Sequence, residues 1–527
     1  MSLLDIRNLS LSIHGTPILD NVSMTLDQGE ELGVVGESGS GKSMTALSVM
    51  HLLPEGAKAS GAIDLGAQAL LELPEAGLCR LRGNEIGMVF QEPMTALNPV
   101  KTIGYQVAET VLVHQPTSRR AALEKAKQAL HRVGLPSELF PMSLYPHELS
   151  GGQRQRVVIA AAIVRHPKLL IADEPTTALD VTTQAQILEL LKKLVREDGM
   201  SLMLISHDLA VVSDIADEVV IMREGRVLEK GPTKQVLRDP QHSYTRRLIK
   251  ASSHNPDRSV LHRDTVLLQI KGLVREYPGR RRGLLRRDPP HRAVNDISFD
   301  IRARESVGLV GESGCGKSTL TRAILGLDDI QDGTIRFGDE VVTAGHHVSK
   351  TARRGMQVVF QDPYGSFNPR LKVKRLVAEP FHLLEDPPAG SARDHAIAEA
   401  LESVGLAATD ADKYIHEFSG GQRQRIAIAR ALIIRPKLIL LDEAVSALDV
   451  SIRAQILDLL ASLSDRFDLS YLFISHDLHV VRSITDRVLV MRAGEIVEEG
   501  QTEAVFSNPQ HPYTQQLIAA APVLEQI

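Results

Sequence analysis

Short apolar runs alternate along this chain with longer segments of helical character. The runs ELGVVG (31–36) and SVGLVG (306–311) each lead into a glycine-rich loop and then a helix-like stretch. Two later runs, LLIA (169–172) and LMLIS (202–206), flank the helical segment AQILELLKKLV (185–195). Strands that alternate with helices in this way are typical of a largely parallel sheet. The pattern therefore predicts an α/β fold.

The same pattern occurs twice in the chain. LSGGQRQR (149–156) returns as FSGGQRQR (418–425), and LLIADEPTTALDV (169–181) returns as LILLDEAVSALDV (438–450). The repeated segments keep their order and, over the second part of each copy, their spacing. A repeat of about 250 residues is a whole domain rather than one turn of a solenoid. The chain is therefore a duplicated domain.

The length of the chain agrees with this duplication, because 527 residues are too many for one core. The segment SSHNPDRSVLHRD (252–264) is polar and has no periodicity, which indicates a linker. We therefore expect a first domain at 1–251, a linker at 252–264 and a second domain at 265–527.

Composition excludes several classes of protein. A formal net charge of −5 argues against a nucleic-acid binder held by bulk electrostatics. The cysteines Cys79 and Cys315 are too few for a disulfide framework or a four-cysteine metal site. We see no signal peptide and no long uncharged apolar stretch, so we expect a soluble, cytoplasmic protein whose membrane work needs a partner.

The two glycine loops carry the first candidate chemistry. GESGSGKS (36–43) and GESGCGKS (311–318) both match the phosphate-loop pattern GxxxxGK[ST]. Glycines permit the tight turn that points backbone N–H groups at phosphate oxygens, and the helix that follows adds its positive N-terminal end. The alternative, a glycine-rich turn without a ligand, does not account for two matches that each follow a strand. We therefore predict nucleoside triphosphate sites.

Paired carboxylates at the ends of two apolar strands form the second candidate site feature. Asp173 and Asp442 are placed to hold Mg²⁺ directly or through water, and Glu174 and Glu443 to orient or deprotonate the water that attacks the γ-phosphate. In isolation, an Asp-Glu pair of this kind is more often a strand-end acid that caps a helix. The phosphate loop in the same repeat favours the catalytic interpretation.

Together these motifs resemble those of the ATP-binding cassette ATPases. The resemblance rests on LSGGQ, the Gln after MVF or VVF, the Asp-Glu pair, ALD and a His at a strand end, and it covers both halves of the chain. It implies α/β cassettes with a mostly parallel sheet core, an antiparallel β subdomain and a helical subdomain. It also implies that the two cassettes pair within the chain, head to tail, around two molecules of ATP with Mg²⁺.

The resemblance assigns a role to each matching residue. The catalytic residues would be Glu174, His207, Gln91, Glu443, His476 and Gln361. Mg²⁺ would be held by Ser43, Gln91, Asp173, Ser318, Gln361 and Asp442. The first phosphate loop would bind nucleotide through Gly36, Glu37, Ser38, Gly39, Ser40, Gly41, Lys42 and Ser43, opposite Ser419, Gly420, Gly421 and Gln422. The second would use Gly311, Glu312, Ser313, Gly314, Cys315, Gly316, Lys317 and Ser318, opposite Ser150, Gly151, Gly152 and Gln153.

The copies differ at the place where family members usually stack adenine on an aromatic ring. Tyr277 fits that role in the second copy, whereas the first copy offers only His14, which also reads as a surface-turn histidine. An Arg-rich run, 279–292, accounts for the extra length of the second copy there. This run either lies in a solvated loop or binds RNA.

Further stretches resemble the peptide and nickel importers. These are FQEPMTALNP (90–99) and FQDPYGSFNPR (360–370), with HSYTRRLI (242–249) and HPYTQQLI (511–518). Two cassettes in one chain are similar to the Yej-type (microcin C and peptide) and glutathione importer subunits. The resemblance implies a peripheral ATPase on the cytoplasmic face of the bacterial inner membrane. Its partners would be two integral-membrane permeases and, indirectly, an extracytoplasmic solute-binding protein, with no nucleic acid.

One rival reading remains open: a tandem-cassette ATPase of the translation-factor or DNA-repair type. Those proteins carry a long charged linker or inserted nucleic-acid domains, whereas the join here is short. Cargo is not specified by these residues, and import rather than export rests on the resemblance alone.

Cys315 allows two interpretations. Either any small residue suffices where the first copy has Ser40, or the helix N-terminus and the nearby Lys317 lower the thiol's pKa and make it reactive. The second interpretation predicts inactivation by N-ethylmaleimide that bound MgATP prevents.

Overall fold

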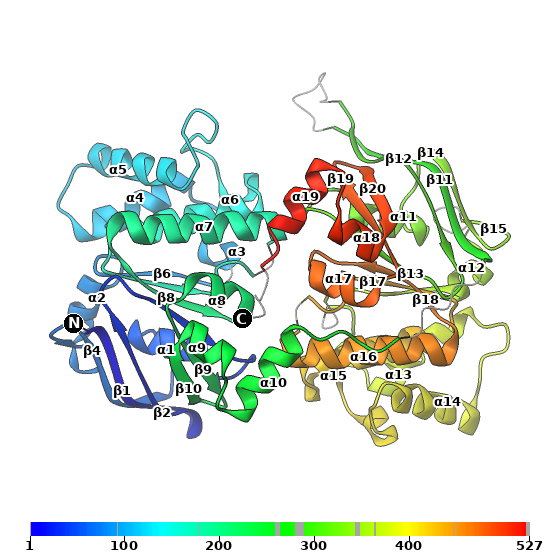
Figure 1. The fold of residues 1–527 in the computed structure, drawn as a ribbon, viewed down its shortest axis with the longest axis horizontal. Coiled ribbons are helices and arrows are strands. Elements are labelled where there is room, and N and C mark those ends of the chain that lie inside the picture. The colour runs from blue at the N-terminus through cyan, green and yellow to red at the C-terminus, as the bar shows by residue number, and fades with distance from the viewer. Residues whose placement is uncertain are drawn as a thin grey trace. The chain divides into compact units, whose positions relative to one another are not determined.

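A computed structural model describes most of the chain (Figure 1). The described residues are 2–91, 93–177, 179–258, 264–279, 289–342, 348–362, 365–446 and 448–522. The chain divides into two compact units, the first mainly Met1–Ser253 and the second mainly His254–Leu448 and Ile452–Ala521. Part of the predicted linker (259–263) and most of the Arg-rich run (280–288) lie outside the described residues.

The first unit contains two sheets. Five strands of the larger sheet are parallel and its edge strand β10 is antiparallel, in the order β10-β9-β3-β8-β7-β6. Its strands are β10 (Arg226–Pro232), β9 (Glu218–Arg223), β3 (Glu31–Val35), β8 (Ser201–Ser206), β7 (Leu169–Asp173) and β6 (Ile86–Val89). The smaller sheet is antiparallel and consists of β2 (Thr16–Asp27), β1 (Ser2–Ile13), β4 (Ala57–Leu65) and β5 (Gln68–Ala69).

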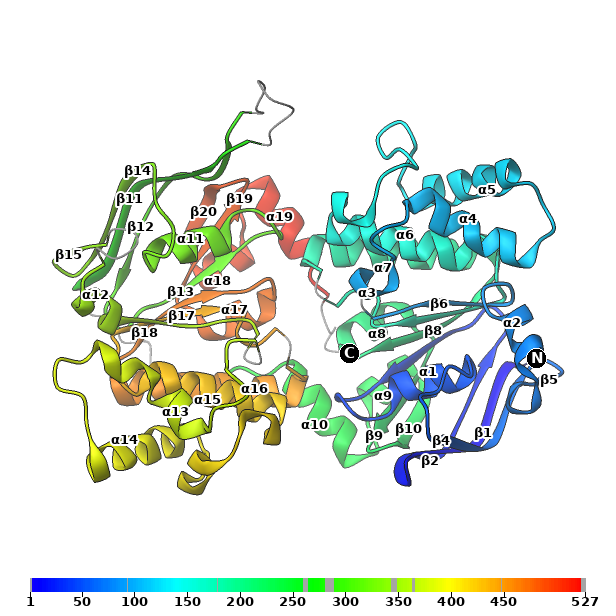
Figure 2. The same ribbon diagram turned by 180° about the vertical axis from the view of Figure 1, so that it is seen from behind.

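The helices of the first unit cover both faces of the larger sheet. They are α1 (Lys42–Val49), α2 (Glu75–Leu81), α3 (Pro93–Ala96), α4 (Ile103–His114), α5 (Arg119–Arg132), α6 (Gly151–Ile163), α7 (Val181–Asp198), α8 (Leu209–Ile215), α9 (Thr233–Arg238) and α10 (Ser243–Ser252). Helix α1 contacts both β2 and β7, so it lies between the two sheets (Figure 2). Helices α4, α5 and α6 pack on one another and form a helical subdomain. Local sequence sets the ends of the helices. The Ser118 hydroxyl caps the start of α5, and Gly199 ends α7 in the left-handed conformation.

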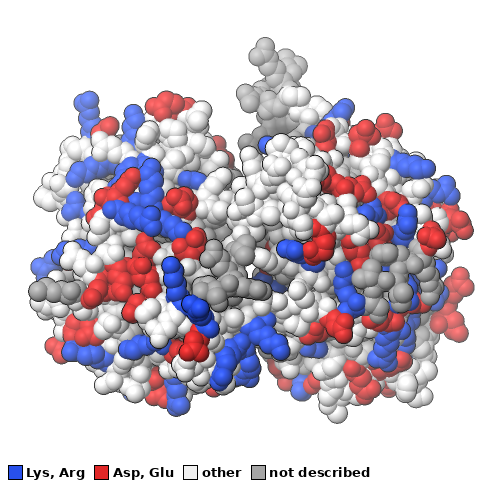
Figure 3. Space-filling model, viewed as in Figure 1, with Lys and Arg blue, Asp and Glu red and all other residues white. Residues whose placement is uncertain are grey.

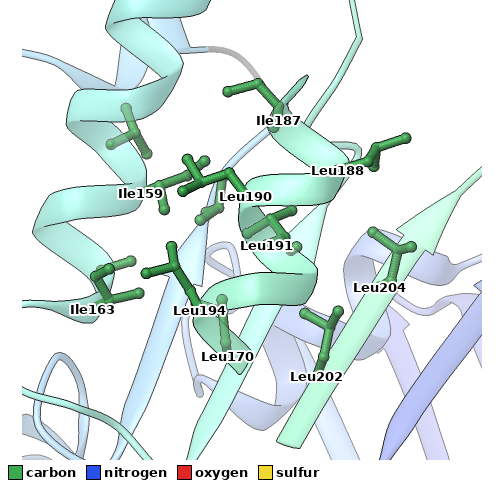
Figure 4. Close-up of a cluster of buried hydrophobic side chains, with 14 of the residues drawn as sticks. Ile159, Ile163, Leu170, Ile187, Leu188, Leu190, Leu191, Leu194, Leu202 and Leu204 are labelled. Atoms are coloured by element: carbon green, nitrogen blue, oxygen red, sulfur yellow. The ribbon is translucent and has the colours of Figure 1, made fainter. Parts of the chain in front are cut away.

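Alternate residues of the central strands enter two different cores, which explains their uninterrupted apolar sequence. In β7, Leu170 faces the core under α6 and α7, whereas Ile171 faces the core that contains α1 and the antiparallel sheet. Figure 4 shows the first of these cores, where side chains of α6 and α7 converge on Leu170, Leu202 and Leu204. The buried strand therefore fixes where its last residues, Asp173 and the following Glu174, leave the sheet.

The second unit repeats this architecture. Its larger sheet has the order β16-β17-β18-β13-β19-β20, with β20 antiparallel, and its smaller sheet β12-β11-β14-β15 is antiparallel. The strands are β11 (Val266–Tyr277), β12 (His291–Arg302), β13 (Ser306–Val310), β14 (Asp332–Phe337), β15 (Glu340–Val341), β16 (Met356–Val359), β17 (Leu438–Asp442), β18 (Ser470–Ile474), β19 (Arg487–Arg492) and β20 (Glu495–Gln501). The helices are α11 (Lys317–Ile324), α12 (Lys350–Gly355), α13 (Val373–Val377), α14 (Gly390–Ser403), α15 (Gly420–Leu432), α16 (Val450–Phe467), α17 (Leu478–Ile484), α18 (Thr502–Ser507) and α19 (Pro512–Ala519). The predicted fold class is confirmed in both units.

Acidic and basic side chains are interspersed over the face of each unit that Figure 3 shows, so neither face carries a field of one sign. Among the described residues, no helix is both long enough and apolar enough to cross a bilayer.

Candidate active site

Four neighbouring parallel strands of the first unit end at the candidate site. In the order β3-β8-β7-β6, they lead into the phosphate loop, His207, Glu174 and Gln91. The carboxyl ends of parallel strands lie at one edge of a sheet, which is where α/β proteins bind their ligands. Sheet order therefore brings together residues that lie more than a hundred positions apart in the sequence.

The first phosphate loop leaves β3 and ends where α1 begins at Lys42. Its Gly36 passes so close to β9 that a Cβ atom there would lie 2.3 Å from the carbonyl oxygen of Met222. Lys42 Nζ is buried and donates to the carbonyl oxygens of Gly36 and Glu37 at 2.6 and 3.0 Å. Burial lowers the pKa of Lys42, an effect that nearby carboxylates partly offset.

Ser43 and Asp173 lie beside this loop as the magnesium hypothesis requires. The Ser43 hydroxyl donates to Asp173 Oδ1 at 3.1 Å. Burial raises the pKa of the Asp173 carboxyl to about 6, and this effect outweighs the hydrogen bond from Ser43 and the charge of Lys42. A hydroxyl and a carboxylate are oxygen ligands of the kind that Mg²⁺ prefers, so these residues fit that ion. Among the described residues, no cluster of three or more His, Cys, Asp or Glu side chains forms a self-contained metal site.

Glu174 is held by three neighbouring side chains. Gln91 Nε2 and the Thr177 hydroxyl donate to Oε2 at 3.0 and 2.9 Å, and His207 Nδ1 lies 3.3 Å from Oε1. Burial opposes ionisation, but the hydrogen bond and charge of His207, with the Thr177 hydroxyl and Lys42, outweigh it and lower the pKa of Glu174 to about 2. The side chain is therefore a carboxylate with a fixed orientation at neutral pH. The sequence did not single out Thr177, although it lies in the repeated strand-end motif.

The second unit builds a related site. Lys317 Nζ donates to the carbonyl oxygens of Gly311 and Glu312 at 2.6 and 2.9 Å. Burial raises the pKa of Asp442 to about 6, and His476 Nδ1 lies 3.4 Å from Glu443 Oε1. Burial opposes ionisation of Glu443, but the His476 contact outweighs it and lowers the pKa of Glu443.

The two units differ in the contacts that hold Glu174 and Glu443. Ser446, the counterpart of Thr177, donates its hydroxyl to the backbone carbonyl of Glu443 rather than to its carboxylate. Gln361, the counterpart of Gln91, is exposed at the end of β16.

The segments 150–153 and 419–422, which we call the signature segments, lie at the starts of α6 and α15. Ser150 and Gln153 make a capping box, and so do Ser419 and Gln422. Ser150 and Ser419 are both exposed, whereas the second glycine of each segment is buried. Each segment thus presents a capped helix N-terminus at its unit's surface, as a phosphate-binding role needs.

The lowered thiol pKa that the second interpretation of Cys315 assumes is wrong. The side chain is buried, and burial raises the pKa of the thiol more than Lys317 lowers it. The sequence shows the helix N-terminus and the lysine, but it does not show that Cys315 Sγ packs into the core under the antiparallel sheet.

The adenine contacts stay predictions. Tyr277 lies at the end of β11, where its hydroxyl donates to Asp328 at 3.0 Å and Arg275 lies 4.6 Å from the ring centroid. One face of the ring is therefore taken by the guanidinium. His14 is exposed in a turn with φ 48° and lies beside Gly56.

Two tyrosines that the sequence analysis noted only as part of a repeat reach the phosphate loops. The Tyr244 hydroxyl accepts from the backbone N–H of Glu37 at 3.3 Å, and the Tyr513 hydroxyl accepts from that of Glu312 at 3.0 Å. The available signal was the repeat of HSYT and HPYT, but nothing in those letters indicates a contact with a loop some 200 positions earlier.

Two family models match this chain, each of them in both units. The ABC transporter family model matches residues 19–177 and 294–446. The model for the oligopeptide/dipeptide transporter C-terminal region matches residues 228–266 and 497–526.

Relatives match along nearly the whole chain. The peptidoglycan transport ATP-binding protein YejF of Agrobacterium fabrum is 46% identical over 536 residues, which cover 100% of this chain and 97% of that protein. The glutathione import ATP-binding protein GsiA of Escherichia coli K12 is 46% identical over 543 residues, which cover 96% and 86%. Among solved structures, CbiO1 of Clostridium perfringens, part of the ABC transporter complex CbiONQ, aligns with 45% of this chain and 91% of its own at 30% identity and a TM-score of 0.41.

Proposed function

This chain is a tandem-cassette ATPase of the ABC transporter family, and we propose that it powers the uptake of peptides or peptide-like solutes by a membrane importer. The match of both units to the oligopeptide/dipeptide transporter C-terminal region supports this class of cargo. So do the relatives named for peptidoglycan and glutathione transport, since glutathione is a peptide and peptidoglycan contains peptides. The rival translation-factor or DNA-repair reading is not favoured, because the relatives that span the chain are transport proteins.

Hydrolysis would take place at the ends of the parallel strands. Lys42 would turn from its two loop carbonyls toward the β- and γ-phosphates, which also face the loop's backbone N–H groups. Mg²⁺, held by Ser43, Gln91 and Asp173, would neutralise charge between the same phosphates. Lys317, Ser318, Gln361 and Asp442 would do the same in the second unit.

Glu174 would orient the attacking water. An ionised carboxylate offers about four lone-pair sites, and three of them are taken by Gln91, Thr177 and His207. The remaining site can accept one hydrogen bond from water. With a pKa of about 2 the carboxylate is a weak base, so orientation rather than full deprotonation is its main contribution. The water oxygen then bonds to the γ-phosphorus as the bond to the β-phosphate bridging oxygen breaks, and the displaced proton ends on phosphate.

The observation that carries this assignment is that Lys42, Ser43, Asp173 and Glu174 lie together at one sheet edge, and the second unit has related lysine and glutamate contacts. We further propose that each phosphate loop works with the signature segment of the other unit. Family resemblance supports that pairing. The pairing predicts that Ser419→Arg impairs hydrolysis at the site built on Lys42 while leaving the fold intact.

Partners and location follow from the same family. We propose that two permease subunits bind the chain at the cytoplasmic face of the inner membrane and that an extracytoplasmic binding protein selects the solute. Co-purification with permeases rather than ribosomes tests the class of protein. ATP-dependent accumulation of labelled peptides in vesicles that contain chain and permeases tests cargo and direction, and failure of every peptide there would refute the cargo assignment.

A further inference from the structure

In each unit, the segment that leads into the last helix (α10 or α19) is hydrogen-bonded to a β-hairpin (β9–β10 or β19–β20). We call this set of contacts the clamp. In the first unit the Glu229 carboxylate of β10 accepts from the backbone N–H groups of Gln241 and His242 at 2.7 and 3.1 Å, and from the Thr245 hydroxyl. The His242 side chain then caps α10 by accepting from the N–H of Tyr244. These contacts leave Tyr244 little freedom, because its position is fixed from both sides.

The second unit repeats the backbone contacts and the histidine cap of this arrangement. Glu498 of β20 accepts from the N–H groups of Gln510 and His511 at 2.7 and 3.0 Å, and His511 caps α19 by accepting from the N–H of Tyr513. The segment reads HPYTQQ here and HSYTRR in the first unit, so the shared residues are those of the clamp and the tyrosine. All of them fall within the matches to the oligopeptide/dipeptide transporter C-terminal region.

The hydroxyl of the tyrosine in this segment contacts the phosphate loop. Tyr244 and Tyr513 are each 3% exposed, and a buried phenol needs a partner for its hydroxyl. The partner is the backbone N–H of the loop's second residue, Glu37 or Glu312. Arg223 lies 5.1 Å from the centroid of the Tyr244 ring, and Arg492 lies 4.9 Å from that of Tyr513. The ring and its hydroxyl are therefore both held.

The same hairpin also contacts the loop at a second point. The N–H of Gly225, in the turn between β9 and β10, donates to the carbonyl of Ser40 at 3.1 Å. Gly494 donates to the carbonyl of Cys315 at 2.9 Å. The helix thus contacts the second residue of the loop through its tyrosine, and the turn of the hairpin contacts the fifth.

Tyrosine and lysine hold the same loop residue from opposite ends. The N–H of Glu37 donates to Tyr244, and its carbonyl accepts from Lys42. In the function proposed above, Lys42 leaves that carbonyl when it turns to the phosphates. The tyrosine contact then remains as a fixed point at the start of the loop. A loop that adopts its binding conformation for only a fraction of the time binds nucleotide proportionally more weakly.

We propose that Tyr244 and Tyr513 are positioning residues through which the C-terminal region of each unit holds its phosphate loop ready for nucleotide. The inference rests on the proposed role of these loops in ATP binding. It gives the C-terminal region a role in setting nucleotide affinity, separate from the chemistry of Glu174.

The test uses the purified full chain with the double variant Y244F/Y513F, which keeps both rings and removes both hydroxyls. Loss of one hydrogen bond should weaken equilibrium ATP binding and raise KM about fivefold, with kcat within about twofold of wild type. Hydrogen exchange should become faster in the peptides that contain the two loops. The single variants Y244F and Y513F give the same readouts unit by unit should the double variant fold poorly.

The matched control is Y471F. Tyr471 is 1% exposed and its hydroxyl donates to the Leu460 carbonyl at 2.9 Å, away from the phosphate loop. Y471F should lower the melting temperature and leave ATP affinity unchanged. Unchanged affinity in Y244F/Y513F, or an equal loss in Y471F, overturns the inference.

The variant K42A/K317A separates the two levels of the proposal. Loss of ATP binding there with normal binding in Y244F/Y513F overturns the tyrosine role alone. Normal ATP binding in K42A/K317A overturns the phosphate-loop assignment and the tyrosine role with it.

Discussion

Replacing Glu174 by Gln tests the mechanism most directly, because the contacts of this side chain define what the change removes. Oε2 accepts from Gln91 and Thr177, and Oε1 faces His207. A glutamine can keep its amide oxygen at the Oε2 position and so retain both donors. Its NH₂ group then faces His207, whose neutral ring can accept. The fold and the phosphate contacts should therefore survive, while the lone pair that accepts from water is lost.

The size of the effect follows from the role. A positioned acid–base group contributes about 10²–10⁴-fold to the rate, and a carboxylate with so low a pKa should fall near the lower end. We therefore expect E174Q/E443Q to hydrolyse ATP about 10²-fold more slowly than wild type. Steady-state phosphate release gives the rate, and an equilibrium titration with a fluorescent ATP analogue shows whether binding is intact. The single variant E174Q should retain at most the share of turnover that the second unit supplies.

Two hydroxyl variants give a matched control. T177V removes a donor to the Glu174 carboxylate, whereas S446A removes one to the Glu443 backbone carbonyl. T177V should slow hydrolysis severalfold and S446A should not. Near-normal turnover in E174Q/E443Q would refute the assignment of the water-orienting role, and equal effects of T177V and S446A would refute the importance of the carboxylate contact.

Three further predictions follow from burial and close contact. Gly152→Ala should destabilise the first unit by about 1–3 kcal/mol, measured by denaturant unfolding, because its Cβ would lie 2.3 Å from a threonine methyl of α7; Gly151→Ala, with no atom nearer than 3.5 Å, should fold normally. N-ethylmaleimide should label exposed Cys79 and leave buried Cys315 unlabelled in the native chain, as mapped by mass spectrometry with unfolded chain as the positive control. Glu229→Gln should lower the melting temperature at pH 7. The difference in melting temperature between variant and wild type should shrink as the pH falls below 4.5, because the folded-state pKa of Glu229 lies below that value and its stabilising contribution is lost on protonation. A difference that does not depend on pH would contradict this.

The sequence predicted those parts of the site whose chemistry is local. Lys42 and Ser43 belong to a phosphate-loop motif whose spacing is visible in the sequence, and Asp173 ends an apolar run that indicates a buried strand. Residues that act through distant contacts could not be predicted in this way. Tyr244 contacts Glu37, which lies 207 positions earlier in the sequence. Cys315 is buried by residues of other strands, and the sequence of the loop gives no information about them.

The backbone at Glu174 and Glu443 has the same unusual conformation in both units. Glu174 and Glu443 have φ values of 46° and 51°, a left-handed conformation that costs a non-glycine residue about 1–3 kcal/mol. Each is held there by its own N–H, which donates to the carbonyl of Ile205 or Ile474 at 2.9 Å.

Those carbonyls lie in β8 and β18, two residues before His207 and His476, the partners of the same carboxylates. Glutamate and histidine are thus joined twice, once through the backbone and once through their side chains. A shift of the strand would move both together and preserve the distance between them. The left-handed backbone at each glutamate therefore helps to keep the carboxylate aligned with its histidine.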